Sequence, residues 1–298
     1  MKKILITGCN GFLGSNLIRF LSNSNYEIVG TSLNDNLENK NFLFKKGDLS
    51  DPLFAKSLIQ LVNPDIIINT VAWTDVDACE VQPEKAYQLN VATAENVARS
   101  ISNKNTKLIY ISTDQLFDGL QSFYSENSIP NPINVYGKTK LEAENVCLSN
   151  HKNTIVVRTN FFGESPKNHK PSFAEWIFNS LNEKKEIKMF TDIFINPIEV
   201  SLFAKAIEKT FSCEYSGILN IVGNERISKY DFGIRLAEKF GFDNSLIVPS
   251  KSAGFNFKAA RPLDMSLSVK KYETLFNYKL PSLEDSLNKF KENKKWKQ

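Results

Sequence analysis

Short apolar runs alternate with longer amphipathic segments over most of the chain. The apolar runs are rich in Ile and Val and carry no polar alternation, as strands of a parallel sheet covered on both faces require. We expect strands at 3–8, 26–32, 64–72, 107–112, 153–159 and 217–223, and helices at 14–23, 51–62, 84–101, 136–148 and 199–211. This order predicts an α/β fold built on a doubly wound parallel sheet, the Rossmann arrangement.

The pattern becomes less regular after Arg158, and helical segments separated by loops follow from about Ile227. We therefore expect a smaller C-terminal lobe over the carboxyl edge of the sheet, where ligands of such folds bind. The predicted division gives 1–160 and 190–222 to a dinucleotide-binding domain, and 161–189 and 223–298 to a substrate-binding lobe.

Composition narrows the function classes. The four cysteines show no CxxC spacing and only two histidines are present, so we expect neither a disulfide framework nor a metal site, and a reducing, cytoplasmic location. No apolar run reaches the roughly 18 residues that span a bilayer, and we interpret the opening MKKILITG as a buried strand rather than a signal peptide. Much of the net charge of +4 lies in the terminal run 289–298, a solvated end rather than a nucleic-acid surface.

A glycine motif, GxxGxxG, follows the first predicted strand directly. Gly8 permits a tight turn, Gly11 permits close approach of a pyrophosphate, and Gly14 permits close packing of the next helix on the sheet. The N-terminus of that helix offers free N–H groups to the anion. The motif predicts a dinucleotide site that also includes the intervening Asn10, Phe12 and Leu13.

The second strand ends at Ser32, with neither an acidic residue for a ribose 2′-hydroxyl nor an arginine for a 2′-phosphate. NADH and NADPH therefore both stay open, with a slight preference for NADPH because no carboxylate repels its extra phosphate. Asp48, followed by Leu49, ends a third apolar run, where its carboxylate is expected to accept a hydrogen bond from the adenine amino group; a simple turn aspartate is the alternative.

Tyr136 and Lys140 are four residues apart in a predicted helix, so both project from one face. An ammonium beside a phenol is expected to lower the phenol's pKa and make it a general acid. Thr113 follows the end of the strand at 107–112 and brings a hydroxyl to the same sheet edge. Together they predict reduction of a carbonyl that Thr113 polarises and Tyr136 protonates, with hydride supplied by a nicotinamide. The alternative, a chance Tyr and Lys on a helix surface, does not explain the glycine motif upstream.

Several longer strings, PDIIINTVAWTDVDACE, STDQLFDG, PINVYGKTKLEAE, VVRT and ARPLDMSLSVKKYE, resemble the extended short-chain dehydrogenases and, within them, the dTDP-4-dehydrorhamnose reductases. Members of that branch reduce the 4-keto group of a nucleotide-linked 6-deoxyhexulose in deoxysugar biosynthesis for surface polysaccharide. The resemblance implies a catalytic triad of Thr113, Tyr136 and Lys140. It further implies a nicotinamide site with Thr70, Val71, Ala72, Asn90, Tyr136 and Lys140, and a nucleotide-sugar site with Thr74, Val76, Thr113, Asp114, Gln115, Phe161 and Arg261.

Three positions depart from the family pattern. Gln115 and Phe161 replace residues that are usually an aromatic and a tryptophan, so we expect a different wall around the sugar. Asn16 stands near the place of a glutamate that holds magnesium between subunits of some members, so no metal is predicted, although a homodimer is possible.

Other functions on the same fold stay open to different degrees. A dehydratase is disfavoured because Gln115 cannot exchange the proton that a glutamate would. A nucleotide-sugar epimerase with tightly held NAD stays open, as does a non-catalytic subunit, because the regulatory chain of methionine adenosyltransferase is similar to the same family.

Overall fold

A computed structural model describes residues 1–35, 42–166 and 169–295. Within these residues, seven parallel strands form one sheet in the order β11-β6-β5-β4-β1-β2-β3. They are β1 (Lys2–Thr7), β2 (Tyr26–Ser32), β3 (Leu43–Lys46), β4 (Ile66–Asn69), β5 (Lys107–Ile111), β6 (Thr154–Arg158) and β11 (Gly217–Asn220). The order reverses between β1 and β4, which is where doubly wound sheets bind their ligands. The predicted doubly wound α/β fold is confirmed.

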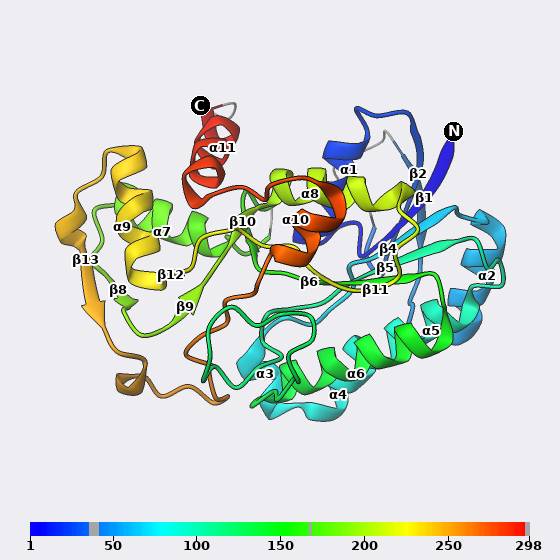
Figure 1. Cartoon of the computed structure of the whole chain (residues 1–298), viewed down its shortest axis with the longest axis horizontal. Helices are drawn as coiled ribbons and strands as arrows, with labels where there is room; N and C mark the ends of the chain where they lie inside the picture. The colour runs from blue at the N-terminus through cyan, green and yellow to red at the C-terminus, as the bar shows by residue number, and fades with distance from the viewer. Residues whose placement is uncertain (36–41, 167–168, 296–298) are drawn as a thin grey trace.

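Helices cover both faces of the sheet (Figure 1). On one face lie α1 (Phe12–Leu21), α8 (Val200–Lys209) and α10 (Lys270–Phe276), and on the other lie α2 (Pro52–Val62), α5 (Thr93–Ser100) and α6 (Val135–Asn150). Successive strand residues point to opposite faces, so Ile4 and Ile6 pack under α1 whereas Leu5 packs under α2. Both faces are apolar for this reason, and burying each such side chain contributes roughly 1.5–3 kcal/mol.

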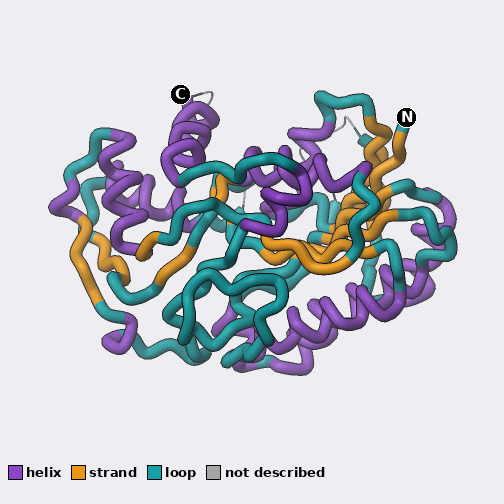
Figure 2. Tube along the Cα trace, viewed as in Figure 1, coloured by secondary structure: helices purple, strands orange, loops and turns teal. Residues whose placement is uncertain are grey.

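The smaller lobe lies at the other end of the molecule from β1 (Figure 2). A second cluster of buried apolar side chains forms its core. Its helices are α7 (Phe173–Asn182), α9 (Lys229–Phe240) and α11 (Leu283–Lys295). The short strands β7 (Phe161–Phe162), β8 (Ile187–Phe190), β9 (Phe194–Ile195), β10 (Ile198–Glu199), β12 (Ile227–Ser228) and β13 (Ile247–Ser250) form three two-stranded sheets. The division of the chain at 160, 189 and 222 stays a prediction. Residues 296–298 of the basic terminal run lie outside the described residues.

The expected helix over 84–101 is present, but a π turn interrupts its regular α-helical hydrogen bonding. The structure has α3 (Val76–Val81), α4 (Pro83–Tyr87) and then a π-helical turn at Gln88–Ala92 before α5. A π turn inserts an extra residue and rotates the chain locally, a device often found at functional sites. Asn90 lies in this turn and is wholly buried. Among the described residues, no helix is long and apolar enough to cross a bilayer.

Candidate active site

The glycine loop after β1 adopts the geometry that its sequence predicts. Gly8 has a φ of +63°, which disfavours other residues. A Cβ on Gly14 would lie 2.3 Å from the carbonyl oxygen of Gly8, so α1 packs directly on the loop. Gly11 precedes α1, and neither a capping side chain nor an acidic residue occupies the first turn. The turn, which includes Phe12 and Leu13, therefore fits the pyrophosphate of the predicted dinucleotide.

The loop after β4 lies against the glycine loop. The Thr70 hydroxyl donates to the carbonyl of Thr7 over 2.6 Å, and a Cβ on Gly8 would lie 2.9 Å from that hydroxyl. Asn90 holds the same loop from the other side, accepting from the Trp73 amide over 2.6 Å and donating to Thr139 over 3.0 Å. The structure thus brings Thr70, with its neighbours Val71 and Ala72, beside the glycine motif. The side chain of Asn90 therefore positions the loop after β4.

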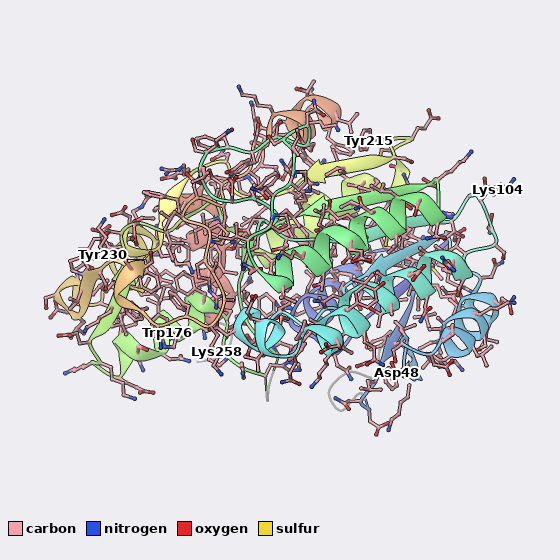
Figure 3. The ribbon with its side chains drawn as sticks, turned by 90° about the horizontal axis from the view of Figure 1, so that it is seen from below. Asp48, Lys104, Trp176, Tyr215, Tyr230 and Lys258 are labelled. Atoms are coloured by element: carbon pink, nitrogen blue, oxygen red, sulfur yellow. The ribbon has the colours of Figure 1, made fainter. Side chains whose placement is uncertain are left out.

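The ends of β2 and β3 carry the residues predicted for the adenosine half. The Ser32 carbonyl accepts from Gly47, which brings Ser32 close to Asp48. Asp48 is exposed, near the strands of the N-terminal half (Figure 3), and its carboxylate accepts from the Ser50 amide over 2.8 Å. Leu49 is buried. Asn10 donates to the backbone carbonyls of residues 34 and 35, so its amide ties the glycine loop to the segment after β2.

The helix α6 places Tyr136 beside Thr113 at the carboxyl end of β5. Asn134 caps α6 by accepting from the Gly137 amide over 2.8 Å. A Cβ on Gly137 would lie 2.3 Å from the carbonyl oxygen of Gln115, so the first turn of α6 lies directly against the loop after β5. Tyr136 and Thr113 are both buried, and the Thr113 hydroxyl is near enough to the Tyr136 phenol to influence its pKa. Two members of the predicted triad therefore meet.

Burial raises the pKa of the Tyr136 phenol, and the nearby carboxylate of Asp114 adds to the rise, whereas the nearby Thr113 hydroxyl opposes it. The predicted lowering by Lys140 is wrong. The Lys140 ammonium bonds instead to the Tyr110 hydroxyl, over 2.5 Å, and to the carbonyl of Ile111, over 2.7 Å. Burial lowers the pKa of Lys140 itself to about 8.

Asp114 is buried next to this pair. Its carboxylate accepts from Asn160 over 2.5 Å and from Thr113 over 3.2 Å. Burial raises the pKa of Asp114 to about 6, although these two hydrogen bonds and the positive charge of Lys229 act to lower it. Gln115 is half-buried and accepts from the Asn134 amide over 3.4 Å. Asp114 and Gln115 therefore lie where the sequence places them, beside Thr113.

Other residues predicted for the sugar side are spread more widely. Val76 lies at the rim of the small cluster that contains Tyr136, and Thr74 is exposed. Arg261 pairs with Asp77 over 3.0 Å, and one of its terminal nitrogens, Nη1, is buried without a hydrogen-bond partner among the described residues. Phe161 stacks on Phe12 with ring centroids 5.5 Å apart and packs in the core under α8. It therefore contacts the first residue of the glycine-loop helix.

Three residues that contact the predicted site residues, Tyr110, Asn134 and Asn160, are not among those predicted from the sequence. Asn134 had a signal, because an asparagine directly before a predicted helix is a preferred N-cap. Tyr110 had none, since an aromatic residue in a buried strand is ordinary.

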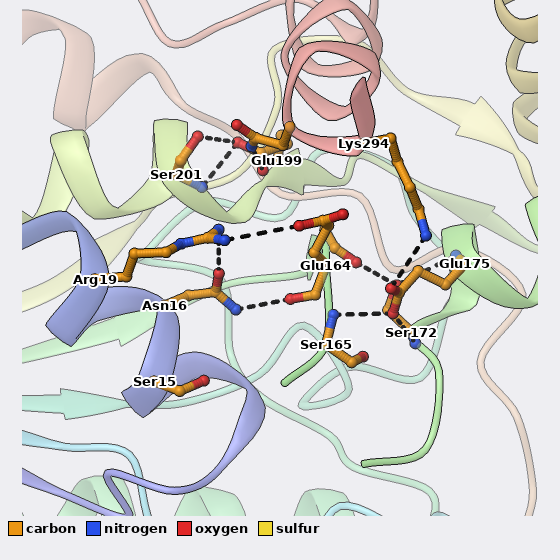
Figure 4. Close-up of polar contacts among 12 residues, drawn as sticks. Ser15, Asn16, Arg19, Glu164, Ser165, Ser172, Glu175, Glu199, Ser201 and Lys294 are labelled. Carbon is orange, nitrogen blue, oxygen red and sulfur yellow. Dashed lines mark hydrogen bonds and ion pairs between the residues drawn. The ribbon is translucent and has the colours of Figure 1, made fainter. Parts of the chain in front are cut away.

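Asn16, where the resemblance predicts no metal ligand, lies in a network of polar contacts with Arg19 and Glu164 (Figure 4). Asn16 donates to the backbone carbonyl of Glu164 over 2.9 Å, and Arg19 donates to Asn16 and lies 3.7 Å from the Glu164 carboxylate. In the same region, Lys294 of α11 lies 3.5 Å from the carboxylate of Glu175 of α7. Among the described residues, no group of three or more acidic, histidine or cysteine side chains is suited to a metal ion.

The fold is a doubly wound sheet with a glycine loop after β1, and Tyr136 lies beside Thr113 at the carboxyl edge of that sheet. These features define a Rossmann-fold protein of the extended short-chain dehydrogenase type. The chain belongs to the family described as RmlD substrate binding domain, whose model matches residues 1–295. It is 29% identical to the probable low-salt glycan biosynthesis reductase Agl14 of Haloferax volcanii, over 95% of each chain. It is 30% identical to methionine adenosyltransferase 2 subunit beta of Rattus norvegicus, over 100% of this chain and 90% of the other.

A solved structure is similar over nearly the whole chain. The dTDP-4-dehydrorhamnose reductase of Bacillus anthracis, in complex with NADP, superposes with a TM-score of 0.84 at 25% identity, covering 97% of this chain and 98% of the other.

Proposed function

We propose that the protein is an NAD(P)H-dependent oxidoreductase that reduces the 4-keto group of a nucleotide-linked 6-deoxyhexulose, in deoxysugar biosynthesis for surface polysaccharide. The observation that carries this proposal is the placement of Tyr136, in the first turn of α6, against the loop after β5 that holds Thr113, at the same sheet edge as the glycine loop. The reductases among the relatives, with the NADP complex of the Bacillus enzyme, support the same reaction class.

The roles of this chain's residues follow from that geometry. The bound nicotinamide supplies the hydride that the keto carbon accepts. Thr113 holds the carbonyl oxygen by its hydroxyl, and Tyr136 gives that oxygen a proton, so that the carbonyl becomes an alcohol. The Tyr136 phenol is protonated at neutral pH, as a proton donor must be, although burial raises its pKa and so makes it a weaker acid than a free tyrosine. Lys140 is placed one helical turn further along α6, where its ammonium is expected at the nicotinamide ribose.

The first test is oxidation of NADPH and of NADH, followed at the nicotinamide absorbance, with dTDP-4-keto-6-deoxyhexose generated in situ and GDP- and UDP-linked ketosugars in parallel. Turnover that requires one ketosugar and is lost in Tyr136→Phe establishes the class and the nucleotide together. The protein is expected to prefer NADPH, to act in the cytoplasm and to form a homodimer, which gel filtration with light scattering tests.

A second candidate function is a non-catalytic regulatory subunit, which the 30% identity to the rat methionine adenosyltransferase subunit favours. NADPH binding without turnover of any ketosugar supports this candidate. An epimerase is distinguished by NAD that copurifies at about one per chain, because an epimerase keeps its cofactor through every turnover.

A further inference from the structure

The Lys140 ammonium is held by two oxygens that both come from β5. It donates to the Tyr110 hydroxyl over 2.5 Å and to the backbone carbonyl of Ile111 over 2.7 Å, and it lies 4.2 Å from the centroid of the Tyr110 ring. An ammonium has three N–H donors and no acceptor. Among the described residues, the Tyr110 hydroxyl and the Ile111 carbonyl accept two of its three donors.

The charge of Lys140 is deeply buried and has no carboxylate of its own. Lys140 is 1% exposed and Tyr110 is 0% exposed. The acidic residue nearest along the helix, Glu144, is bound by Arg158 of β6 through two nitrogens, at 3.0 and 2.8 Å. The other titratable groups around Lys140 and Tyr110 are Cys147 and Tyr136, both on α6. Both hydrogen bonds of this ammonium therefore go to neutral oxygens of β5, while Glu144 and Cys147 act on it only at longer range through charge.

The hydroxyl and the ring of Tyr110 have different roles: the hydroxyl accepts a hydrogen bond from Lys140, whereas the ring only packs in the core. The ring packs in the apolar cluster between β5 and the helices α5 and α6, where a phenylalanine of the same shape would fill the space equally well. Burial raises the pKa of Tyr110 well above its usual range, so the phenol stays neutral and accepts from Lys140. A purely structural aromatic residue at this place would need no hydroxyl.

We infer that Tyr110 is a positioning residue for Lys140: its phenol oxygen, with the carbonyl of Ile111, fixes the ammonium at the carboxyl end of β5 and keeps it charged. The inference rests on the proposed function only for the role of Lys140 at the nicotinamide ribose. Tyr110 acts through Lys140 and makes no contact with the substrate. Because β5 is a central strand, paired on both sides by β4 and β6, it provides a rigid support for the ammonium.

The direct test measures the pKa of Lys140 in the cofactor-free protein. Lysine labelled with ¹³C at Cε is followed by NMR against pH, and the Lys140 signal is assigned by its loss in Lys140→Met. Tyr110→Phe removes an acceptor of the ammonium's hydrogen bond and so disfavours the charged form. We expect Lys140 to titrate about one pH unit lower in Tyr110→Phe than in the unsubstituted protein.

Tyr272→Phe is the matched control. Tyr272 is also 0% exposed, and its hydroxyl donates to the carbonyl of Ala206 over 2.8 Å, against α8 on the other face of the sheet. Both variants lose one buried hydroxyl, so thermal unfolding reports their shared cost. Lys140 is expected to titrate unchanged in Tyr272→Phe.

A second readout is the affinity for NADPH across pH. If Lys140 holds the cofactor as an ammonium, affinity falls as Lys140 loses its proton, and this fall moves about one pH unit lower in Tyr110→Phe. The positioning role is overturned if Lys140 titrates at the same pH in Tyr110→Phe and in the unsubstituted protein, or shifts equally in Tyr272→Phe. The NMR titration needs no sugar and no turnover, so a failure of the proposed reaction leaves this answer intact.

Discussion

Asn160 donates a hydrogen bond of 2.5 Å to the carboxylate of Asp114 and so joins the end of β6 to the end of β5 beside Tyr136. The bond stabilises the charged carboxylate, yet burial still raises the pKa of Asp114 to about 6. A negative charge is therefore kept next to the proposed proton donor at a cost in stability, which makes its removal informative.

Asp114→Asn is expected to stabilise the protein at pH 7. The pKa of Asp114 is about 6 when folded and near 3.8 when unfolded, so between these values the native state binds more protons and stability falls as pH rises. The variant escapes this loss, which amounts to at most about 3 kcal/mol. Urea unfolding at pH 7 and pH 4 measures it, and the difference between the two proteins should shrink towards pH 4.

The neighbouring Asp118 supplies a control of opposite sign. Hydrogen bonds from Tyr124 and the Leu120 amide lower the pKa of Asp118, so its charge stabilises the fold at neutral pH and this contribution is lost as pH falls. Asp118→Asn should therefore be less stable than the unsubstituted protein at pH 7. Stabilisation by both substitutions would contradict the account of Asp114.

Tyr136→Phe is expected to lower kcat by about two to four orders of magnitude, because it removes the proton donor. NADPH affinity should stay nearly unchanged, since the aromatic ring and its packing against Cys79 and Ala86 are kept. Tyr272→Phe serves again as the control for loss of a buried hydroxyl. Unchanged turnover in Tyr136→Phe would exclude the proposed mechanism.

Lys140→Met is expected to weaken NADPH binding and turnover while raising stability. The pKa of Lys140 is about 8 when folded against 10.5 when unfolded, so the unfolded state binds more protons between these values and stability rises with pH. At pH 7 the buried charge costs about 3 kcal/mol, which methionine avoids. Urea unfolding at pH 7 and pH 10 should show the advantage of the variant narrowing at the higher pH. Cofactor affinity equal to that of the unsubstituted protein would refute the ribose role of Lys140.

Gly14→Ala is expected to destabilise the protein by about 1–3 kcal/mol and to weaken NADPH binding, because the new methyl group forces α1 away from the glycine loop. Gly254→Ala is the matched control, since nothing lies within 4 Å of a Cβ built there. Both substitutions reduce the flexibility of the unfolded chain, but only Gly14→Ala creates a close contact. Thermal unfolding and NADPH titration of both variants therefore measure the effect of close packing at Gly14. Equal behaviour of the two variants would show that the close approach at Gly14 is unimportant.

The sequence by itself determined the sheet, the glycine loop and the Tyr136 and Thr113 positions. These features depend on local signals: the run of Ile in β4, the glycine spacing, and the four-residue separation on one helix face. Each signal is short in range, because strand burial, tight turns and helical periodicity are fixed by neighbouring residues.

Only the tertiary structure decided which partners these residues meet. That Lys140 bonds to Tyr110 depends on the register of α6 over β5, and that Asn160 reaches Asp114 depends on the pairing of β6 with β5. The predicted lowering of the Tyr136 pKa is wrong for the same reason. Desolvation depends on all the groups around the phenol, and few of these are its neighbours in the sequence. The π turn at Asn90 and the stacking of Phe161 on Phe12 likewise arise from contacts between distant segments, and no local pattern encodes them.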